Sequence, residues 1–121
     1  MSKRILVVED HEENRRILRL LLTKAGFELI EAETGEDGVR LAETERPDLI
    51  LMDIQLPGLD GYEATRRIKA NPELRAVPLI VVTSYALSGD DVKAFEAGCD
   101  AYVTKPFVPR QLLAKIREYL G

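Results

Sequence analysis

Short apolar runs alternate with amphipathic stretches along this chain, and four of the runs end on polar residues. The polar residues are Glu9-Asp10, Asp53, Thr83 and Lys105-Pro106. Such runs are typical of strands that are buried on both faces of a parallel sheet. The carboxyl ends of parallel strands lie on one edge of the sheet, so we expect these residues to meet there, where α/β folds bind ligands. The pattern therefore predicts an α/β fold and locates its functional site.

The alternation predicts a doubly wound α/β fold, in which five parallel strands form one sheet and five helices cover its two faces. Right-handed crossovers between the strands leave few possible topologies. The second strand is more polar than the others, which predicts that it lies at an edge of the sheet. The predicted strands are residues 4–8, 28–32, 49–53, 79–83 and 101–104, and the predicted helices are residues 12–25, 35–45, 62–69, 88–97 and 109–120.

Length and composition favour one domain over residues 1–121, with no room for a separate output domain. No apolar run approaches the roughly 20 residues of a membrane span, and no signal-peptide pattern opens the chain, so we expect a cytoplasmic protein. The net charge is -4 and the positive residues are scattered, which argues against a nucleic-acid binder. The single Cys99 cannot form an internal disulfide and is expected to be buried. We expect a monomer or a weak dimer.

The carboxylates of Glu9, Asp10 and Asp53 raise an electrostatic problem, because three negative charges in a small volume repel one another. Without compensation, the repulsion raises their pKa values and pushes protons onto them. A divalent cation bound by the carboxylate oxygens, with Lys105 alongside, removes the problem. The sequence therefore predicts a divalent-cation site at the carboxyl edge of the sheet.

Four sequence motifs follow one another in a characteristic order. They are Ile-Leu-Val-Val-Glu-Asp at 5–10, Leu-Met-Asp-Ile-Gln-Leu-Pro-Gly-Leu-Asp-Gly at 51–61, Val-Val-Thr-Ser-Tyr-Ala at 81–86 and Tyr-Val-Thr-Lys-Pro-Phe at 102–107. The ordered set resembles the receiver domain of two-component response regulators, although each motif alone is a weak signal. Asp-Ile-Gln-Leu-Pro is similar to stand-alone regulators of this family, and Glu9-Asp10 followed by Asn14 also occurs in receivers attached to hybrid histidine kinases.

The resemblance implies that Asp53 is the phosphoacceptor, which attacks a phosphohistidine and becomes an acyl phosphate. Asp10 and Asp53 would supply oxygen ligands to Mg²⁺, with the backbone carbonyl of Gln55 as a third ligand. Glu9 would act through a bound water. The implied partners are a sensor histidine kinase or a histidine phosphotransferase, and a downstream protein target.

The resemblance also assigns roles to residues around the acceptor. Thr83 would donate its hydroxyl to a phosphoryl oxygen, beside the backbone N–H of Ser84. Lys105 would pair with the phosphoryl group and be held inward by a cis bond before Pro106. Tyr102 would be an aromatic switch that changes rotamer as Thr83 engages the phosphate. The alternative for Tyr102 is a half-buried strand tyrosine whose hydroxyl faces water.

The predicted helix 12–25 carries apolar residues over an arc of roughly 200°, which is wider than packing on one sheet face requires. Some of its leucines should therefore be exposed, either as incidental surface or as a docking face for the histidine-bearing domain of a partner. The residues expected to dock the partner are Asn14, Leu18, Leu22 and Pro106. His11 replaces the Asp or Asn that the family commonly has, and we expect it to start the helix and not to bind Mg²⁺.

The lifetime of the phosphorylated state depends on how water reaches the acceptor. By the resemblance, Gln55 and Tyr85 flank that approach, and neither is a carboxylate that could position the water. If the bulky Tyr85 shields the phosphoryl group, autodephosphorylation is slow. The alternative is that Tyr85 points to solvent, in which case the shielding is absent.

Three other interpretations remain open. A haloacid-dehalogenase-like phosphatase also uses an aspartate nucleophile with Mg²⁺ on a parallel sheet, but its nucleophile follows the first strand, whereas Asp53 follows the third. An inactive receiver that serves as a constitutive adaptor is disfavoured by the intact acceptor, metal and lysine positions. The chain could also be a receiver excised from a hybrid histidine kinase. We expect no enzyme activity beyond self-phosphorylation and slow autodephosphorylation.

Overall fold

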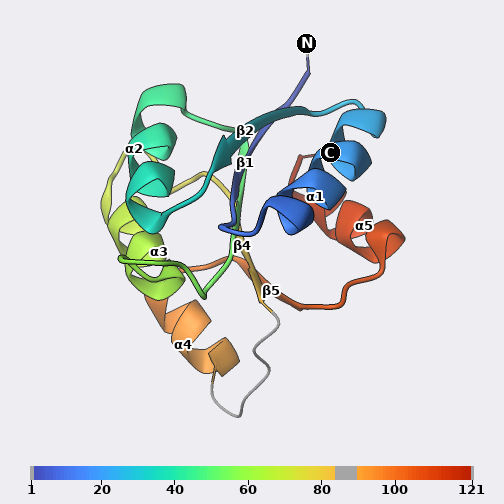
Figure 1. The fold of residues 1–121 in the computed structure, drawn as a ribbon. Helices are drawn as coiled ribbons and strands as arrows, with labels where there is room; N and C mark the ends of the chain where they lie inside the picture. The colour runs from blue at the N-terminus through green and yellow to red at the C-terminus, as the bar shows by residue number, and fades with distance from the viewer. Residues whose placement is uncertain (1, 84–89, 121) are drawn as a thin grey trace.

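The computed structural model describes residues 2–83 and 90–120, in which strands and helices alternate in the predicted order (Figure 1). In chain order the described elements are β1 (Arg4–Val8), α1 (Glu12–Lys24), β2 (Glu28–Ala32), α2 (Gly35–Glu45), β3 (Leu49–Met52), α3 (Gly61–Ala70), β4 (Leu79–Thr83), α4 (Asp90–Ala97), β5 (Ala101–Thr104) and α5 (Pro109–Leu120). None of the helices in these two ranges is both long enough and apolar enough to cross a bilayer.

The described strands form one parallel sheet in the order β2-β1-β3-β4-β5. β2 lies at an edge, as its polar sequence predicts. The chain winds from β1 to β2 on one side and then crosses to β3 on the other side, so the winding reverses between β1 and β3. Doubly wound sheets bind ligands at the carboxyl ends of the strands where this reversal occurs. Val8 pairs with Met52, which brings Glu9 and Asp53 to the same level of the sheet.

Two hydrophobic cores fill the space on the two sides of the sheet. α1 and α5 cover one face, and α2, α3 and α4 cover the other (Figure 1). Alternate residues of one strand point to opposite sides. Ile5 and Val7 pack in the core with α1 and α5, while Leu6 and Val8 pack in the other core. The apolar runs are therefore buried on both faces, as expected for a parallel sheet.

The start of α3 lies against the end of β3, next to the site. α3 begins at Gly61, one residue earlier than predicted, because the Asp60 carboxylate caps it by accepting a hydrogen bond from the N–H of Glu63 at 2.9 Å. A Cβ at Gly61 would lie 2.1 Å from the backbone oxygen of Asp53, so only glycine permits this close approach. The expected cap of the fourth helix, Ser88, lies outside the described residues.

Candidate functional site

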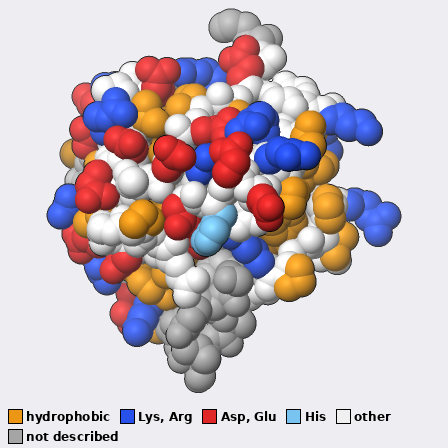
Figure 2. All heavy atoms as spheres, in the orientation of Figure 1, with side chains coloured by type: hydrophobic (Ala, Val, Ile, Leu, Met, Phe, Trp, Pro, Cys, Tyr) orange, Lys and Arg blue, Asp and Glu red, His pale blue; other side chains and the backbone are white. Residues whose placement is uncertain are grey.

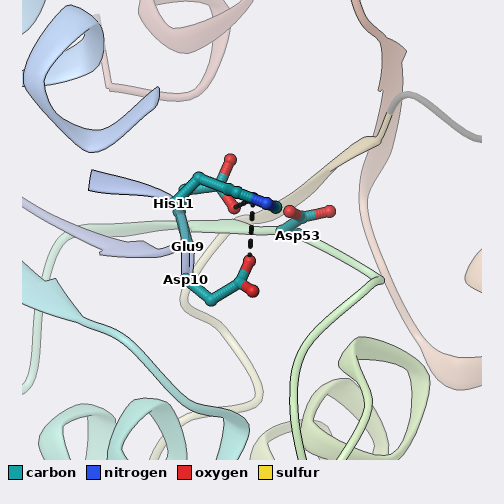
Figure 3. A group of neighbouring side chains, drawn as sticks. All are labelled: Glu9, Asp10, His11 and Asp53. Carbon is teal, nitrogen blue, oxygen red and sulfur yellow. Dashed lines mark ion pairs between the residues drawn. The ribbon is translucent and has the colours of Figure 1, made fainter. Parts of the chain in front are cut away.

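The carboxylates that follow β1 and β3 meet at the carboxyl edge of the sheet, as predicted. Glu9 and Asp10 follow β1, and Asp53 follows β3 (Figure 3). Glu9 is 2% exposed and Asp53 is 7% exposed, while Asp10 is partly exposed. One ligand atom from each of these residues and one from His11 all lie within 4.8 Å of one another. Three carboxylates thus share a small and largely buried volume.

Lys105 reaches this group from the end of β5. Its Nζ lies 2.6 Å from Oε1 of Glu9 and 3.5 Å from Oδ2 of Asp53. The peptide bond between Lys105 and Pro106 is cis, as expected. The backbone N–H of Lys105 also donates to the carbonyl oxygen of Thr83 at 2.7 Å, which joins the ends of β5 and β4. The ends of β1, β3, β4 and β5 therefore build one site, as the sequence predicts.

The two buried carboxyl groups have opposite pKa shifts. Burial raises the pKa of Asp53 to about 7, and the hydrogen bond to Glu9 and the charge of Glu9 add to this effect, against the opposing charge of Lys105. Burial also acts to raise the pKa of Glu9, but hydrogen bonds from Asp53 and Lys105 outweigh it and lower that pKa to about 2. Of the two carboxyl groups, Asp53 is therefore the one that gives up its proton less readily, while Glu9 stays ionised.

The oxygen atoms of the site fit a divalent cation. Within the described residues, Oε2 of Glu9 and Oδ1 of Asp10 are buried without a hydrogen-bond partner. Asp53, in contrast, accepts a hydrogen bond from the backbone N–H of Gln55 at 3.3 Å. Leaving a buried carboxylate oxygen without a donor is costly, and a bound cation removes that cost. The available oxygens are the hard ligands that Mg²⁺ prefers.

The residues expected to respond to phosphorylation are partly described. Thr83 is buried at the end of β4. Tyr102 is partly buried in β5, where it packs against the core of α2, α3 and α4 and is paired with Val81. This position is compatible both with a switch and with a half-buried strand tyrosine. Ser84 and Tyr85 lie outside the described residues.

Arg15 is a residue of the site that the sequence analysis missed. Its side chain is 6% exposed, and Nη1 donates a hydrogen bond to the backbone oxygen of Glu9 at 2.8 Å. Nη2 of the same guanidinium lies 3.0 Å from Oε1 of Glu33. Arg15 therefore holds the backbone of the acidic pair in place. A signal exists in the sequence, because Arg15 lies on the same helical face as Leu18 and Leu22, where a charge is unusual.

Leu18 and Leu22 are not the exposed leucines of α1 that the docking prediction assumed. They are 4% and 0% exposed, because they point from α1 into the core against the sheet. The exposed apolar residues of α1 are instead Ile17 and Leu20, at 54% and 64%. These two confirm that the apolar arc of α1 is wider than packing on the sheet requires.

A groove of about 460 Å³ lies beside the carboxylates, between the start of α1 and the segment that follows β5. Its lining includes Asp53, Gln55 and Lys105 from the site. The remaining walls are formed by His11, Asn14, Ile17, Leu18, Pro106, Phe107 and Pro109. Figure 2 shows hydrophobic side chains gathered beside the acidic side chains that surround the single histidine. Of the four residues expected to dock a partner, Asn14, Leu18 and Pro106 line the groove, with Leu18 as a buried part of its wall.

The doubly wound five-stranded sheet, with acidic residues, a threonine and a lysine at its carboxyl edge, agrees with the receiver-domain resemblance of the sequence. The family definition of the response regulator receiver domain matches residues 5–117. The chain is 42% identical over 121 residues to the polar-differentiation response regulator DivK of Brucella anthropi, an alignment that covers 100% of this chain and 98% of that protein. The chain therefore belongs to the response regulator receiver domain family of two-component signalling.

Solved structures show the same fold. The receiver domain of the sensor histidine kinase PA1611 from Pseudomonas aeruginosa is 39% identical with a TM-score of 0.93, over 100% of this chain and 99% of that one. That structure has a magnesium ion coordinated in its active-site cleft. A CheY-like receiver domain from Methanospirillum hungatei is 37% identical with a TM-score of 0.90, over 99% of this chain and 94% of that one. The predicted fold class is thus confirmed.

Proposed function

We propose that this chain accepts a phosphoryl group from a phosphohistidine onto Asp53, that the reaction requires Mg²⁺, and that the chain signals through contacts with other proteins. The observation that supports this most directly is the position of Asp53. Its buried carboxyl group lies among two further carboxylates and 3.5 Å from the ammonium of Lys105. Membership of the receiver family supports the same proposal.

Asp53 is the best placed acceptor among the three carboxylates. It borders the groove, whereas Glu9 and Asp10 do not form part of the groove lining. Glu9 is 3% exposed at its side chain and is occupied by the contact with Lys105 at 2.6 Å. A donor that enters the groove therefore meets Asp53 first. Glu9 and Asp10 remain for the metal, Glu9 through a water.

The chemistry begins with deprotonation of Asp53. Its oxygen must be ionised to attack phosphorus, so any proton that the raised pKa of Asp53 retains is first released to solvent through the groove. The bond between phosphorus and the imidazole nitrogen of the donor then breaks, and its electron pair stays on the imidazole. Mg²⁺, when held by Asp10, Asp53 and the Gln55 carbonyl, supplies positive charge that favours the ionised carboxylate and neutralises the phosphoryl oxygens.

Thr83 and Lys105 contact the oxygens of the phosphoryl group on Asp53 in this proposal. Lys105 exchanges its contact with Glu9 for a phosphoryl oxygen, and the Thr83 hydroxyl donates to another oxygen. The backbones of the two residues are joined by a hydrogen bond of 2.7 Å, so a shift at one is passed to the other. Tyr102 lies in β5, three positions before Lys105, and its change of rotamer would carry the signal to the surface.

The phosphoryl donor is proposed to dock at the groove and along the exposed side of α1. Ile17 borders the groove, and Leu20 lies one helical turn further along α1. A helix that packs an apolar side on these residues can place its histidine beside Asp53. A sensor histidine kinase or a histidine phosphotransferase is the kind of partner that offers such a helix.

The phosphorylated state is proposed to be long-lived. The exposed Gln55 borders the groove and can orient a water through its amide, but it cannot act as a base. Phosphate release from the wild type and from Tyr85→Ala, compared in Mg²⁺ without partners, measures the lifetime. A clearly faster variant supports shielding by Tyr85, and equal rates contradict it.

The proposal is tested by incubation with Mg²⁺ and a small phosphodonor, followed by intact mass measurement. We expect one stable added phosphate on the wild type and none on Asp53→Asn. Steady turnover of phosphate esters would instead indicate a phosphatase. A chain that neither gains phosphate nor turns over esters would be an inactive adaptor.

A further inference from the structure

His11 places an imidazole among the carboxylates of the site. Its backbone lies at the N-cap position of α1, but its side chain makes no capping hydrogen bond. Instead, Nδ1 lies 3.1 Å from Oδ1 of Asp10 and 3.8 Å from Oε2 of Glu9 (Figure 3). The chain contains one histidine, so any imidazole chemistry of this protein belongs to this residue.

The oxygens that face the imidazole are the two that lack a hydrogen-bond partner. Within the described residues, Oε2 of Glu9 and Oδ1 of Asp10 are both buried and unpartnered, and the 3.1 Å contact with His11 does not have hydrogen-bond geometry. The other oxygen of Glu9 is taken by Lys105. The Glu9 side chain is 3% exposed, so solvent does not satisfy Oε2. Two oxygen atoms without a hydrogen-bond partner thus lie within 3.8 Å of the same imidazole nitrogen.

The spacing of these atoms suits a small metal ion. Two ligands that each lie about 2.1 Å from an ion are separated by roughly 3.0 Å at an octahedral angle and roughly 3.4 Å at a tetrahedral angle. The 3.1 Å separation of His11 and Asp10 falls in this range, and the 3.8 Å separation of His11 and Glu9 is close to it. Asp53 completes a set of four residues whose ligand atoms lie within 4.8 Å of one another. Small side-chain movements are enough to close the set around an ion.

The imidazole changes which ions the site prefers. Mg²⁺ takes oxygen ligands and gains little from a nitrogen. Zn²⁺ and its neighbours among the transition metals bind imidazole well, and their affinity for mixed nitrogen and oxygen sites exceeds that of the hard cations. An Asp or Asn at position 11 would offer oxygen to the same place. The nitrogen of His11 therefore favours a transition metal over Mg²⁺.

We propose that Glu9, Asp10, His11 and Asp53 form a binding site for a divalent transition-metal ion of the Zn²⁺ type. The regulatory consequence rests on the proposed function, because the same carboxylates are needed there for Mg²⁺. The two ions cannot share these ligands, so Zn²⁺ excludes Mg²⁺ and stops phosphorylation of Asp53. His11 then makes this receiver sensitive to the transition-metal concentration around it.

The test compares the Zn²⁺ affinity of the metal-free full chain with that of His11→Asn. Asn keeps an oxygen at this position and is a favourable helix N-cap, so the fold should persist. Competition against a chromophoric chelator measures Zn²⁺ binding, and the rise in melting temperature measures Mg²⁺ binding. We expect Zn²⁺ affinity to fall about tenfold or more in the variant, and to fall far more than Mg²⁺ affinity.

A second readout reports the imidazole directly. Since His11 is the single histidine, its ring signals in the NMR spectrum can be followed without ambiguity. They should shift on addition of Zn²⁺ in step with the chelator titration. Glu43→Gln, which alters an exposed acid on α2, is the matched control and should bind Zn²⁺ as the wild type does.

Equal Zn²⁺ affinity in the wild type and in His11→Asn would overturn the proposal. So would an equal loss of Zn²⁺ and Mg²⁺ affinity, because His11 would then only organise the carboxylates. Failure of the proposed function is distinguishable. A wild type that gains no phosphate with Mg²⁺ and phosphodonor, yet binds Zn²⁺ through His11, contradicts the phosphoacceptor role and supports the metal site.

Discussion

Two groups of charged residues meet at the start of α1. Both contain carboxylates and cationic side chains, but they differ in how completely the carboxylates are paired. The site group consists of Glu9, Asp10, Asp53 and Lys105. The α1–β2 network consists of Arg15, Arg19, Glu12, Glu31 and Glu33. In the network every carboxylate lies against a guanidinium. In the site group, two carboxylate oxygens have no hydrogen-bond partner within the described residues.

The pKa shifts of the two groups differ in direction. Hydrogen bonds from Arg19 hold the pKa of Glu31 below its ordinary value, against a smaller effect of burial. Burial and the neighbouring Glu9 raise the pKa of Asp53 to about 7. The carboxylates of the α1–β2 network are paired with guanidinium groups and stabilise the fold. The carboxylates of the site group keep unpartnered oxygens, which suits the binding of a cation from solution. The balance of charge thus separates the structural group from the functional one.

Replacing Asp53 with Asn should have the largest effect, because it removes the proposed acceptor and should abolish phosphorylation. The folded chain without metal should become more stable at pH 8, by about 1 to 2 kcal/mol, since one charge leaves a repulsive group. The sign follows from linkage: an acid whose pKa is raised on folding adds stability at low pH that is lost as the pH rises through about 7.

Unfolding in denaturant at pH 5 and pH 8 measures this difference. At pH 5 the wild-type Asp53 is protonated and resembles Asn, so the advantage of the variant should shrink. An advantage of the same size at both pH values would show that the charge of Asp53 is not its cause.

Arg15→Ala should have the next largest effect, because Arg15 belongs to the α1–β2 network and also holds the backbone of Glu9 in place. Removing this buried guanidinium leaves the buried Glu9 carbonyl without its donor, at a cost of about 1 to 3 kcal/mol, while the exposed Glu33 is solvated by water. Arg19→Ala is the matched control: it also loses the contact with Glu31 but touches no atom of the site group. Thermal unfolding should show a much smaller loss for Arg19→Ala.

Arg15→Ala and Arg19→Ala can also be compared in their response to Mg²⁺, which separates the site group from the α1–β2 network. The rise in melting temperature on addition of Mg²⁺ should be reduced in Arg15→Ala and kept in Arg19→Ala. A full Mg²⁺ response in Arg15→Ala would mean that its hydrogen bond to Glu9 does not position the acidic pair.

Mg²⁺ itself should raise the melting temperature of the wild type by a few degrees at millimolar concentration, because an ion that binds only the folded state stabilises it by mass action. The rise should vanish in Asp10→Ala and persist in Glu43→Ala, an exposed acid on α2. Differential scanning fluorimetry provides the measurement. No response in the wild type would count against a cation in the site group.

The smallest effect is expected for Glu31→Gln in the network. Because its pKa is lowered on folding, Glu31 contributes stability above its ordinary pKa of 4.5 that is lost as the pH falls through the lowered value. Its partner Arg19 is partly exposed, so solvent screening keeps the loss at pH 7 under about 1 kcal/mol. Unfolding at pH 7 and pH 3 measures it, and a loss that grows at pH 3 would contradict this account.

The sequence predicted the strand ends well because burial on both faces leaves an unmistakable run of apolar residues. Once the parallel sheet is accepted, Asp53 and Lys105 must lie on the same edge. The polar β2 was correctly placed at the edge of the sheet for the same reason. These successes depend on strand periodicity and on the topology of parallel sheets, which both follow from the chain alone.

The predictions for α1 were less accurate because an apolar arc does not fix how a helix is rotated on a sheet. An arc of roughly 200° allows several rotations, and packing selects the one that buries Leu18 and Leu22 and leaves Ile17 and Leu20 exposed. The position of Arg15 on the buried face of α1 is visible in the sequence, but its contact with the site is made to the backbone carbonyl of Glu9, which the sequence does not reveal. The orientation of side chains around such contacts is decided by the folded structure.

The contact between Lys105 and Glu9 joins residues that are 96 positions apart in the chain. Glu9 follows β1 and Lys105 follows β5, so this contact exists only when both strands are in place in the sheet. A partly synthesised or partly unfolded chain therefore has the acidic pair without the ammonium, and loop closure over this distance comes late in folding. The proposed phosphoryl transfer to Asp53 therefore requires a sheet that is assembled through β5, because Lys105 reaches the site only from the end of that strand.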